Sequence, residues 1–511
     1  MKKVIGYQRE ALFIRRAQVP PDLRSTLKSD NTVVFYTEKH CNKCEYLQDR
    51  HSDICDNCNA FKGRSELYSE VIINDKQYIK LPLGRIDKVQ RQFERHDLTL
   101  KFKNKHPKPV LSRPIEYTGT FRKWQPNAID ALVEGKRGVL KSKPRSGKTV
   151  MCAAAVCRVG LKTLIVASQR DWLDGFHETF VGSSTQKALT TLSKKRIGFC
   201  RKLEDFKKYD VCLCTVQTFY SPKGQKLLRQ IRDMFGIIIC DEAQTTAARI
   251  YIQVLAKLNA EYFWVVSGTP SRKDGRFTLV HRVIGKLLHE TDVPSLTPSI
   301  ELAKTNYVQK SYKQGYVPLH WLESGLENNK ARLKLIAKHA IQDMKKGHMI
   351  LIPFRRRKAQ ASLVALINKL AGEKVAYQFA GGAGQKNYRK DVIDKARRYK
   401  VKIIVGTLSL LDKGINIPRA SMIYECALSS NKENAEQRIS RILTPYKNKP
   451  QPTIKLFLDD MGARQKMMRF EYYQVILPKF KPYVSKRDKI VLEEYFKQKE
   501  KEELFYGGDV V

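Results

Sequence analysis

Short apolar segments recur along the middle of the chain, and a stretch long enough for a helix separates each from the next. Apolar runs of this length are typical of parallel strands that are covered on both faces. They form two groups, so we expect an α/β protein with two sheets in tandem. The first group is GVLKS (138–142), KTLIVAS (162–168), DVCLCTV (210–216), GIIICDE (236–242) and YFWVVSG (262–268). The second group is HMILIPF (348–354), KVAYQFAG (374–381), VKIIVGT (401–407), SMIYEC (421–426) and TIKLFLDD (453–460).

The domain boundaries follow from this pattern. Between the two groups lies DVPSLTPSI (292–300), whose two prolines and two serines predict a hinge. We expect an N-terminal domain over 1–115, sheet domains over 116–295 and 296–460, and a helical C-terminal extension over 461–511. A chain of 511 residues is long enough for several units, each with its own core.

The charge indicates a polyanionic partner. The chain has 95 Lys and Arg against 51 Asp and Glu, a formal net charge of +44, and most of the excess lies between residues 116 and 460. An excess of this size on folded domains favours nucleic acid as the partner. No apolar run approaches the roughly 18 to 20 residues that cross a bilayer. Gln8, Arg9 and Glu10 interrupt any secretory signal. We therefore expect a cytoplasmic protein, in the host cytoplasm if viral, with no membrane partner.

A candidate phosphate-binding loop lies at KSKPRSGKTV (141–150), after an expected strand and before a helix-compatible segment. The loop amides would surround the β-phosphate, Lys148 would reach the β- and γ-oxygens, and Thr149 would ligate Mg²⁺. Ser142 stands where the usual pattern has its first glycine, and a chance GKT at a helix start is the alternative. The candidate ATP-binding residues of the loop are Arg145, Ser146, Gly147, Lys148 and Thr149.

Two adjacent acids follow another expected strand, in GIIICDEAQ. Asp241 is placed to hold Mg²⁺ through water, and Glu242 to orient and deprotonate an attacking water. An acid pair after a strand could equally be a solvated loop. The loop and the acid pair in this order together predict ATP hydrolysis.

With these elements, residues 116–460 resemble a superfamily two helicase or translocase. The matching motifs are FRKWQ (121–125), DEAQ (241–244), SGTP (267–270), VGTLSLLDKGINIP (405–418) and EQRISRILTP (436–445). The resemblance implies two RecA-like domains, with ATP and Mg²⁺ as cofactors, and a motif at SGTP that couples hydrolysis to domain movement. It also implies nucleotide contacts from Arg122, Trp124 and Gln125, with Gln125 at the adenine edge, and from Gly414 and Asn416.

The sixth motif departs from the family pattern. Q-x-x-G-R-x-x-R is represented by Gln437, Ser440, Arg441 and Thr444, so the second arginine is absent. The resemblance implies that Gln437 and either Arg438 or Arg441 serve the γ-phosphate, or else that hydrolysis is slow. A nucleic-acid-binding protein with a decayed ATPase is therefore an alternative.

By the same resemblance, polar residues after successive strands would contact phosphate and sugar, which position a strand without specifying its sequence. Each could instead be a simple cap or turn. These residues are Ser168, Arg170, Thr215, Gln217, Arg355 and Thr407. The run FRRRK (354–358) could be a phosphate clamp or an exposed helix start. The basic residues in 385–402 are more typical of a solvated helix face.

Four cysteines near the N-terminus have the spacing C-x₂-C-x₁₀-C-x₂-C, which suits a structural Zn²⁺ bound by four thiolates. An iron–sulfur cluster or free thiols are the alternatives. The predicted ligands are Cys41, Cys44, Cys55 and Cys58. The surrounding domain would bind a nucleic-acid branch or a partner protein.

The narrower likeness is to bacteriophage branch-migration helicases of the UvsW type. It implies a monomeric DNA helicase or translocase that remodels forks, R-loops and Holliday junctions, with replication or recombination proteins as further partners. An RNA helicase remains open, because the shared core contacts only the backbone of the strand.

Overall fold

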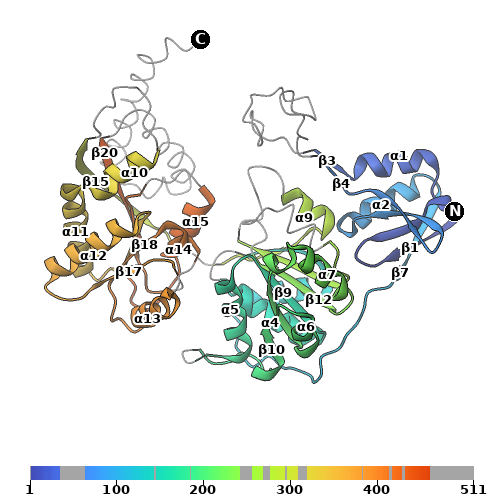
Figure 1. The fold of residues 1–511 in the computed structure, drawn as a ribbon, viewed down its shortest axis with the longest axis horizontal. Helices are drawn as coiled ribbons and strands as arrows, with labels where there is room; N and C mark the ends of the chain where they lie inside the picture. Colours follow the sequence, from blue (N-terminus) through green and yellow to red (C-terminus); the bar gives the residue numbers. More distant parts are fainter. Residues whose placement is uncertain are drawn as a thin grey trace, which may run out of the picture. The chain divides into compact units, whose positions relative to one another are not determined.

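A computed structural model describes residues 2–34, 64–142, 146–183, 186–241, 256–268, 277–293, 296–308, 319–382, 384–413, 417–427 and 432–460. The predicted cysteine site and the predicted C-terminal extension lie outside these residues. The chain divides into two compact units, Met1–Val293 and Pro294–Val511, which are described in turn (Figure 1).

The first unit begins with a small α/β domain in the range expected for an N-terminal domain (1–115), although its sheet was not predicted from the sequence. Its five-stranded sheet has the order β5-β6-β2-β1-β7, in which β1 pairs antiparallel with β2 and parallel with β7. The strands are β1 (Lys2–Gln8), β2 (Leu12–Arg15), β5 (Ser69–Ile73), β6 (Lys76–Leu81) and β7 (Leu98–Asn104). The helices are α1 (Pro21–Asp30) and α2 (Ile86–Glu94), with 3₁₀ turns η1 (Arg16–Gln18) and η2 (Leu83–Arg85).

A separate two-stranded ribbon extends from this domain. β3 (Thr32–Val34) pairs antiparallel with β4 (Arg64–Glu66), and Val34 lies opposite Arg64. The two strands flank residues 35–63, so both ends of the segment that contains the four cysteines are fixed side by side.

The first sheet domain has seven strands in the order β10-β11-β9-β12-β13-β8-β14, with all neighbours parallel. The strands are β8 (Arg137–Lys141), β9 (Thr163–Ala167), β10 (Ile197–Phe199), β11 (Val211–Thr215), β12 (Ile237–Asp241), β13 (Tyr262–Ser267) and β14 (Leu287–Glu290). The helices are α3 (Gln125–Gly135), α4 (Lys148–Val159), α5 (Arg170–Val181), α6 (Leu203–Lys208), α7 (Pro222–Gln230) and α9 (Phe277–Val283), with 3₁₀ turns η3 (Lys194–Arg196) and η4 (Val216–Phe219).

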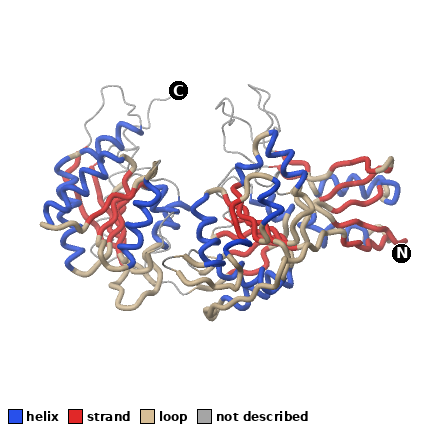
Figure 2. Tube along the Cα trace, turned by 60° about the horizontal axis from the view of Figure 1, so that its bottom comes forward, coloured by secondary structure: helices blue, strands red, loops and turns tan. Residues whose placement is uncertain are grey.

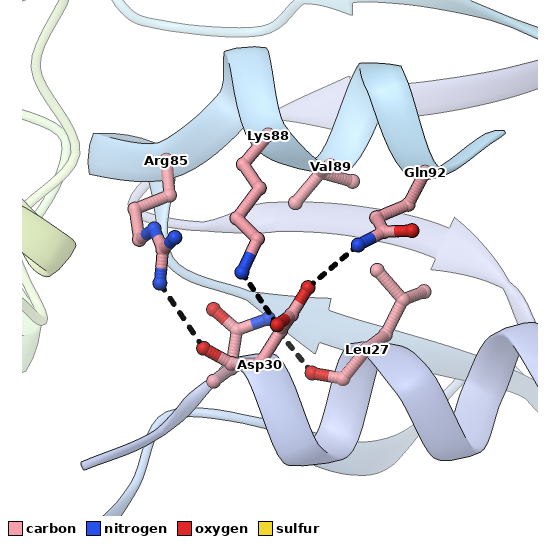
Figure 3. A pocket seen from close by; sticks show the side chains of 7 residues that line it. Leu27, Asp30, Arg85, Lys88, Val89 and Gln92 are labelled. Atoms are coloured by element: carbon pink, nitrogen blue, oxygen red, sulfur yellow. Dashed lines mark hydrogen bonds and ion pairs between the residues drawn. The ribbon is translucent and has the colours of Figure 1, made fainter. Parts of the chain in front are cut away.

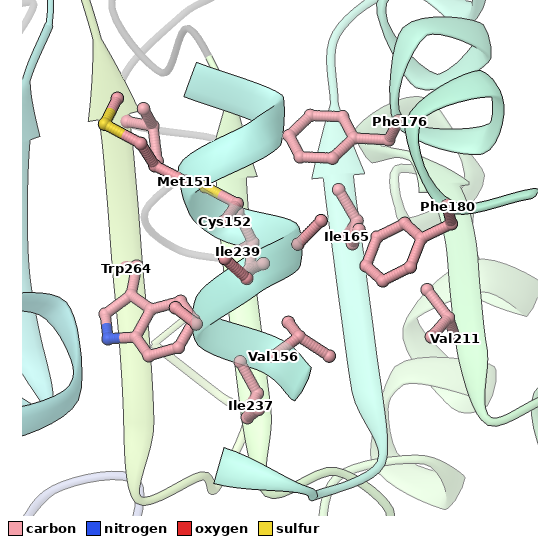
Figure 4. Close-up of a cluster of buried hydrophobic side chains, with 14 of the residues drawn as sticks. Met151, Cys152, Val156, Ile165, Phe176, Phe180, Val211, Ile237, Ile239 and Trp264 are labelled. Atoms are coloured by element: carbon pink, nitrogen blue, oxygen red, sulfur yellow. The ribbon is translucent and has the colours of Figure 1, made fainter. Parts of the chain in front are cut away.

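Helices cover both faces of this sheet (Figure 2). Alternate strand residues face opposite ways, so Ile165 packs under α4 and α5 whereas Leu164 packs in the core cluster that α6, α7 and α9 cover. Figure 4 shows the core beneath α4 and α5, where Phe176 and Trp264 lie on either side of α4. Burial of each such side chain stabilises the fold by about 1.5 to 3 kcal/mol.

The second unit contains a six-stranded parallel sheet in the order β15-β20-β19-β16-β18-β17. The strands are β15 (Ser299–Val308), β16 (Ile350–Phe354), β17 (Ala376–Phe379), β18 (Ile403–Thr407), β19 (Met422–Glu425) and β20 (Thr453–Asp460). The helices are α10 (Leu319–Asn328), α11 (Lys330–Lys345), α12 (Arg357–Ala371), α13 (Gln385–Arg397), α14 (Leu408–Lys413) and α15 (Lys432–Ser440). α11 and α12 cover one face, and α13, α14 and α15 cover the other.

Three buried ion pairs connect this second sheet to its helices. Arg332 on α11 binds Asp459 on β20, with 2.7 Å from Nε to Oδ1 and no exposed surface on either side chain. Lys455 on β20 pairs with Asp343 on α11, which also accepts a hydrogen bond from Tyr424. The third pair involves the sixth motif and is described with the site.

The prediction of two tandem parallel-sheet α/β domains is confirmed, and all ten expected strands form. Both sheets are consistent with a RecA-like architecture. The segment predicted as a hinge (292–300) contains the division between the units, but its last two residues already belong to β15. No helix in the described ranges is long and apolar enough to span a membrane.

Candidate nucleotide and nucleic-acid sites

The phosphate loop and the SGTP motif begin next to each other. β8 and β13 are paired neighbours, with Lys141 opposite Ser267, and the backbone amide of Ser142 donates to the carbonyl of Ser267 at 2.8 Å. β12 pairs with β13 on its other side and brings Asp241 opposite Val266. The carboxyl ends of these parallel strands therefore form one edge, which is where ligands bind in sheets of this kind.

Ser142, which replaces the usual first glycine, has a structural role in the loop. Its fully buried hydroxyl lies 2.5 Å from Oγ of Ser146 and 2.8 Å from Oγ1 of Thr291. Thr291 follows β14, so a distant segment of the chain fixes both sides of the loop. A glycine could not make these bonds, and the departure from the pattern is compatible with an ordered loop.

The FRKWQ element packs directly on the loop. Nε2 of Gln125 and Nε1 of Trp124 both donate to the carbonyl of Ser146, at 3.0 and 3.1 Å. Oε1 of Gln125 accepts the backbone amide of Arg122 at 2.8 Å, and the Gln125 side chain is 2% exposed. The Arg122 guanidinium lies 5.7 Å from the Trp124 ring centroid. The amide of Gln125 thus fixes the loop position, and its remaining donor and acceptor are the groups with which it would bind a base.

Gly147 must be a glycine in this arrangement. It precedes α4 with φ +87, and a Cβ there would lie 2.2 Å from Nε2 of Gln125. The left-handed backbone lets α4 begin at Lys148, so the first amides of the helix face the end of the loop, as anion binding requires.

Lys148 and Asp241 face each other at this edge. Nζ of Lys148 lies 4.0 Å from Oδ1 of Asp241, and the side chains are 14% and 10% exposed. A lysine, a helix N-terminus and the Thr149 hydroxyl offer groups for phosphate oxygens, and Asp241 offers a carboxylate of the kind that Mg²⁺ prefers. The described residues therefore fit an ATP and Mg²⁺ site. Four predicted nucleotide-site residues lie outside the described ranges: Arg145, Glu242, Gly414 and Asn416.

Three of the predicted nucleic-acid residues of the first unit come together at the same edge. Ser168 follows β9 and Thr215 ends the adjacent β11, and Nε2 of Gln217 donates to the Ser168 carbonyl at 2.9 Å. Arg170 differs, because its guanidinium lies 3.0 Å from the Phe199 ring centroid and 3.6 Å from Oδ1 of Asp174. Its charge is therefore partly used within the domain.

In the second unit, Arg355 and Thr407 lie side by side. Arg355 follows β16 and Thr407 ends β18, where Thr407 pairs with Phe354. Nε of Arg355 is bound to Glu323 on α10 at 2.8 Å. Glu327 of the same helix accepts the backbone amides of Arg355 and Arg356, and burial raises its pKa. Sequence reasoning missed both glutamates, because nothing local connects α10 with this loop.

Arg438 is paired with a carboxylate of its own domain. Its side chain is fully buried, and its Nε and Nη2 bind both oxygens of Glu425 on β19 at 3.0 and 2.9 Å. Arg438 is thus held inside the second sheet domain by Glu425, which favours a structural role, and its assignment to the γ-phosphate stays a prediction. Gln437 on α15 and Arg441, just after it, are partly exposed.

Two family profiles match the chain. The profile described as "Type III restriction enzyme, res subunit" matches residues 118–272, and the profile "Helicase conserved C-terminal domain" matches residues 331–443. These matches fall on the first and second sheet domains respectively.

Curated relatives are similar over most of the same region. A protein named putative ATP-dependent RNA helicase L396, from Acanthamoeba polyphaga mimivirus, is 24% identical over 385 residues, covering 70% of this chain and 69% of that protein. A putative DNA 3'-5' helicase Rad25 from Halobacterium salinarum is 24% identical over 343 residues, covering 64% of this chain and 52% of that protein. The DNA 3'-5' translocase XPB2 of Sulfurisphaera tokodaii is 21% identical and covers 66% of this chain and 80% of that protein.

Among solved structures, the T4 UvsW structure aligns over 90% of both chains, at 14% identity and a TM-score of 0.39. The Saccharomyces cerevisiae Dbp5 structure, with RNA and ADP bound, aligns over 74% of this chain and 93% of the other, at 16% identity and a TM-score of 0.49.

Proposed function

Because this chain belongs to the superfamily two helicases and is an ATP-dependent nucleic-acid helicase, we propose that its substrate is branched DNA, such as forks, R-loops and four-way junctions. Support for DNA comes from relatives that are named as DNA helicases or translocases. The N-terminal domain, which packs on the first sheet domain within one compact unit, is the part that we propose to bind the branch.

The contact between these two domains is the observation on which the proposal depends. Nη1 of Arg282, on α9, donates to the carbonyl of Asp30 at 2.6 Å, and a Cβ on Gly84 would lie 2.3 Å from the carbonyl of His281. Glu10 of the N-terminal domain pairs with Arg232. α9 follows the SGTP motif in the chain, and in the proposed cycle its contact with the N-terminal domain transmits changes at that motif.

On the N-terminal side of this contact, several hydrogen bonds converge on Asp30. Figure 3 shows a pocket between α1 and α2 in which Lys88 and Gln92 bind the Asp30 carboxylate, at 2.5 and 2.8 Å. Arg85 donates to the same Asp30 carbonyl that Arg282 binds. Burial acts to raise the pKa of Asp30, but the hydrogen bonds from Lys88 and Gln92 outweigh it and lower that pKa, so the carboxylate is charged at neutral pH.

In the proposed cycle, Lys148 and the first amides of α4 bind the phosphates, and Gly147 and Gln125 keep the loop in place. Thr149 and Asp241 would hold Mg²⁺, which would supply positive charge to the phosphate oxygens. Glu242 accepts the proton of the attacking water. Arg441 supplies the arginine of the sixth motif, because Arg438 is bound to Glu425.

We further propose that Cys41, Cys44, Cys55 and Cys58 bind one structural Zn²⁺. Their spacing supports this, as does the β3–β4 ribbon, which fixes the ends of the segment. Cys44→Ser should lower the zinc content by one ion per chain and weaken binding of forked DNA. Cys157→Ser, on α4, is the control that should leave the zinc content unchanged; equal zinc in both variants would remove this proposal.

The test of the substrate is ATPase activity on matched single-stranded, forked, four-way and RNA substrates. We expect forked and four-way DNA to stimulate turnover most. Greater stimulation by RNA would select the second candidate, an RNA helicase, which the name of the mimivirus relative favours. Turnover at background on every substrate would contradict the assignment of a working motor.

A further inference from the structure

Three side chains form a cluster at the amino-terminal edge of the second sheet. Tyr399 precedes β18, Arg419 precedes β19 and Tyr446 precedes β20. The Arg419 guanidinium lies 3.9 Å from the Tyr399 ring centroid, and the neighbouring Tyr399 side chain raises the pKa of Tyr446. The strands are parallel, so this cluster lies at the opposite edge from Arg355 and Thr407.

The cluster is accessible although its members are in contact. Tyr399 is 51% exposed and Tyr446 is 41% exposed. Arg419 is half-buried, and within the described ranges it makes no ion pair and no hydrogen bond. Burial lowers its pKa, and the charges that oppose this come from the two tyrosines rather than from a carboxylate. Among the described residues, no carboxylate neutralises the positive charge of Arg419.

Tyr399 has a backbone conformation that favours a smaller residue. It follows α13 with φ +65, its amide donates to the carbonyl of Ala396 at 3.2 Å, and the amide of Lys400 donates to that of Lys395 at 2.9 Å. This is the helix-ending turn in which glycine or asparagine is preferred, because a Cβ is strained at positive φ. A tyrosine is strained at this position, and strained residues of this kind concentrate at functional sites.

The turn that contains Tyr446 is shaped in a similar way. Asn448 has φ +53, and the amide of Lys449 donates to the carbonyl of Tyr446 at 3.3 Å. Basic side chains surround both turns and are exposed: Arg398, Lys400 and Lys447. Aromatic faces combined with exposed cations are the features that bind single-stranded nucleic acid without sequence preference.

We propose that Tyr399, Arg419 and Tyr446, with Arg398, Lys400 and Lys447 around them, form a second binding surface for single-stranded nucleic acid. Bases stack on the tyrosines, and the basic residues bind phosphates. The choice of partner rests on the proposed function, but the surface is distinct from the predicted track at the carboxyl edge. The two edges are about 16 Å apart, from five residues per strand at roughly 3.3 Å each. Two segments of one substrate can therefore be bound at once.

Tyr399→Gly separates binding from folding best, because glycine adopts the positive φ of this turn without strain. Resistance of the variant to urea should equal or exceed that of the unchanged chain. We expect its affinity for fluorescein-labelled oligodeoxythymidylate, measured by anisotropy with the full chain, to fall about tenfold, and that of Tyr399→Gly with Tyr446→Ala to fall further. Tyr388→Ala is the matched control, since Tyr388 is an exposed tyrosine on α13 that lies outside the cluster.

Photocrosslinking of an oligonucleotide that contains 5-iodouracil gives an independent readout, and crosslinks at Tyr399 or Tyr446 are expected. Unchanged affinity in the double variant, or displacement of the oligonucleotide from this surface by poly-glutamate at low concentration, would overturn the inference. Crosslinks without any nucleic-acid-stimulated ATPase would instead support the surface and contradict the proposed function. ATPase measured without nucleic acid should be the same in all these variants.

Discussion

The two sheet domains share one architecture but differ in where they bury polar side chains. Within the described strands of the first sheet, buried polar residues lie at strand ends, as Asp241 and Ser267 do beside the phosphate loop. In the second sheet, Lys455 lies inside β20 and is paired with Asp343. The first sheet therefore keeps its buried polar residues at strand ends, with Asp241 and Ser267 next to the phosphate loop, whereas the second sheet has one inside a strand that connects the sheet to a helix.

This difference predicts that the most damaging substitutions in the two domains should affect different quantities. In the first domain the chemistry should fail while the fold survives. In the second domain the fold should fail first, because an ion pair that loses one partner leaves an uncompensated buried charge.

The largest effect is expected for Lys148→Ala. Loss of a cation that neutralises charge developing on the γ-phosphate costs about 10³-fold or more in turnover. Nucleic-acid-stimulated ATPase should fall to background, while anisotropy of labelled DNA and the urea midpoint of the first unit change little. Retained turnover would contradict the nucleotide site.

The next largest effect is expected for Arg438→Ala, and it should appear in the stability of the fold. Because it leaves Glu425 buried without its partner, the free energy of unfolding should fall by about 3 to 5 kcal/mol. The paired change Arg438→Met with Glu425→Leu should be much milder, as measured by urea unfolding. If Arg438→Ala unfolds like the unchanged chain and only slows ATP hydrolysis, the residue belongs to the γ-phosphate after all.

A smaller effect is expected at the contact between the N-terminal domain and the first sheet domain, where Nδ1 of His106 lies 2.7 Å from Oδ1 of Asn259. Burial lowers the pKa of His106 to about 4, from 6.5. The folded state thus favours the neutral ring, so the stability it contributes is complete above pH 6.5 and is lost as the pH falls towards about 4.

Glutamine cannot titrate in this range. In His106→Gln, the loss of free energy of unfolding between neutral and acid pH should therefore be smaller, by about 3 kcal/mol at most. The measurement is thermal unfolding of the first unit at pH 7 and at pH 4.5. An identical loss of stability in variant and unchanged chain over this range would show that other groups cause it.

The parallel strands were predictable because they are buried on both faces and therefore consist of continuous apolar residues. The edge strands β14 and β15 were missed because neither has a continuous apolar run of strand length. LLHE in β14 is short, and in SIELAKTNYV of β15 apolar residues alternate with polar ones. The N-terminal domain was expected, but its strands were not predicted because they are also partly polar, and the parallel pairing of β1 with β7 joins the two ends of the domain.

The candidate site divides in a similar way. Lys148, Gly147 and Asp241 were predictable, because each follows a strand within a local pattern. The role of Ser142 was not, since its partner Thr291 comes from the far end of the domain. The burial of Arg438 depends on its ion pair with Glu425. The strand that contains Glu425 was predicted, but the sequence did not indicate that Arg438 would be its partner.

The β3–β4 ribbon has a consequence for how such a protein can diversify. Val34 and Arg64 are directly opposed, so their Cα atoms are separated by only about 5 Å, the spacing of neighbouring strands. A segment whose two ends are this close together can be exchanged between lineages, or shortened to a tight turn. Either change would preserve the register of the surrounding strands. Substrate preference and motor could then evolve at independent rates.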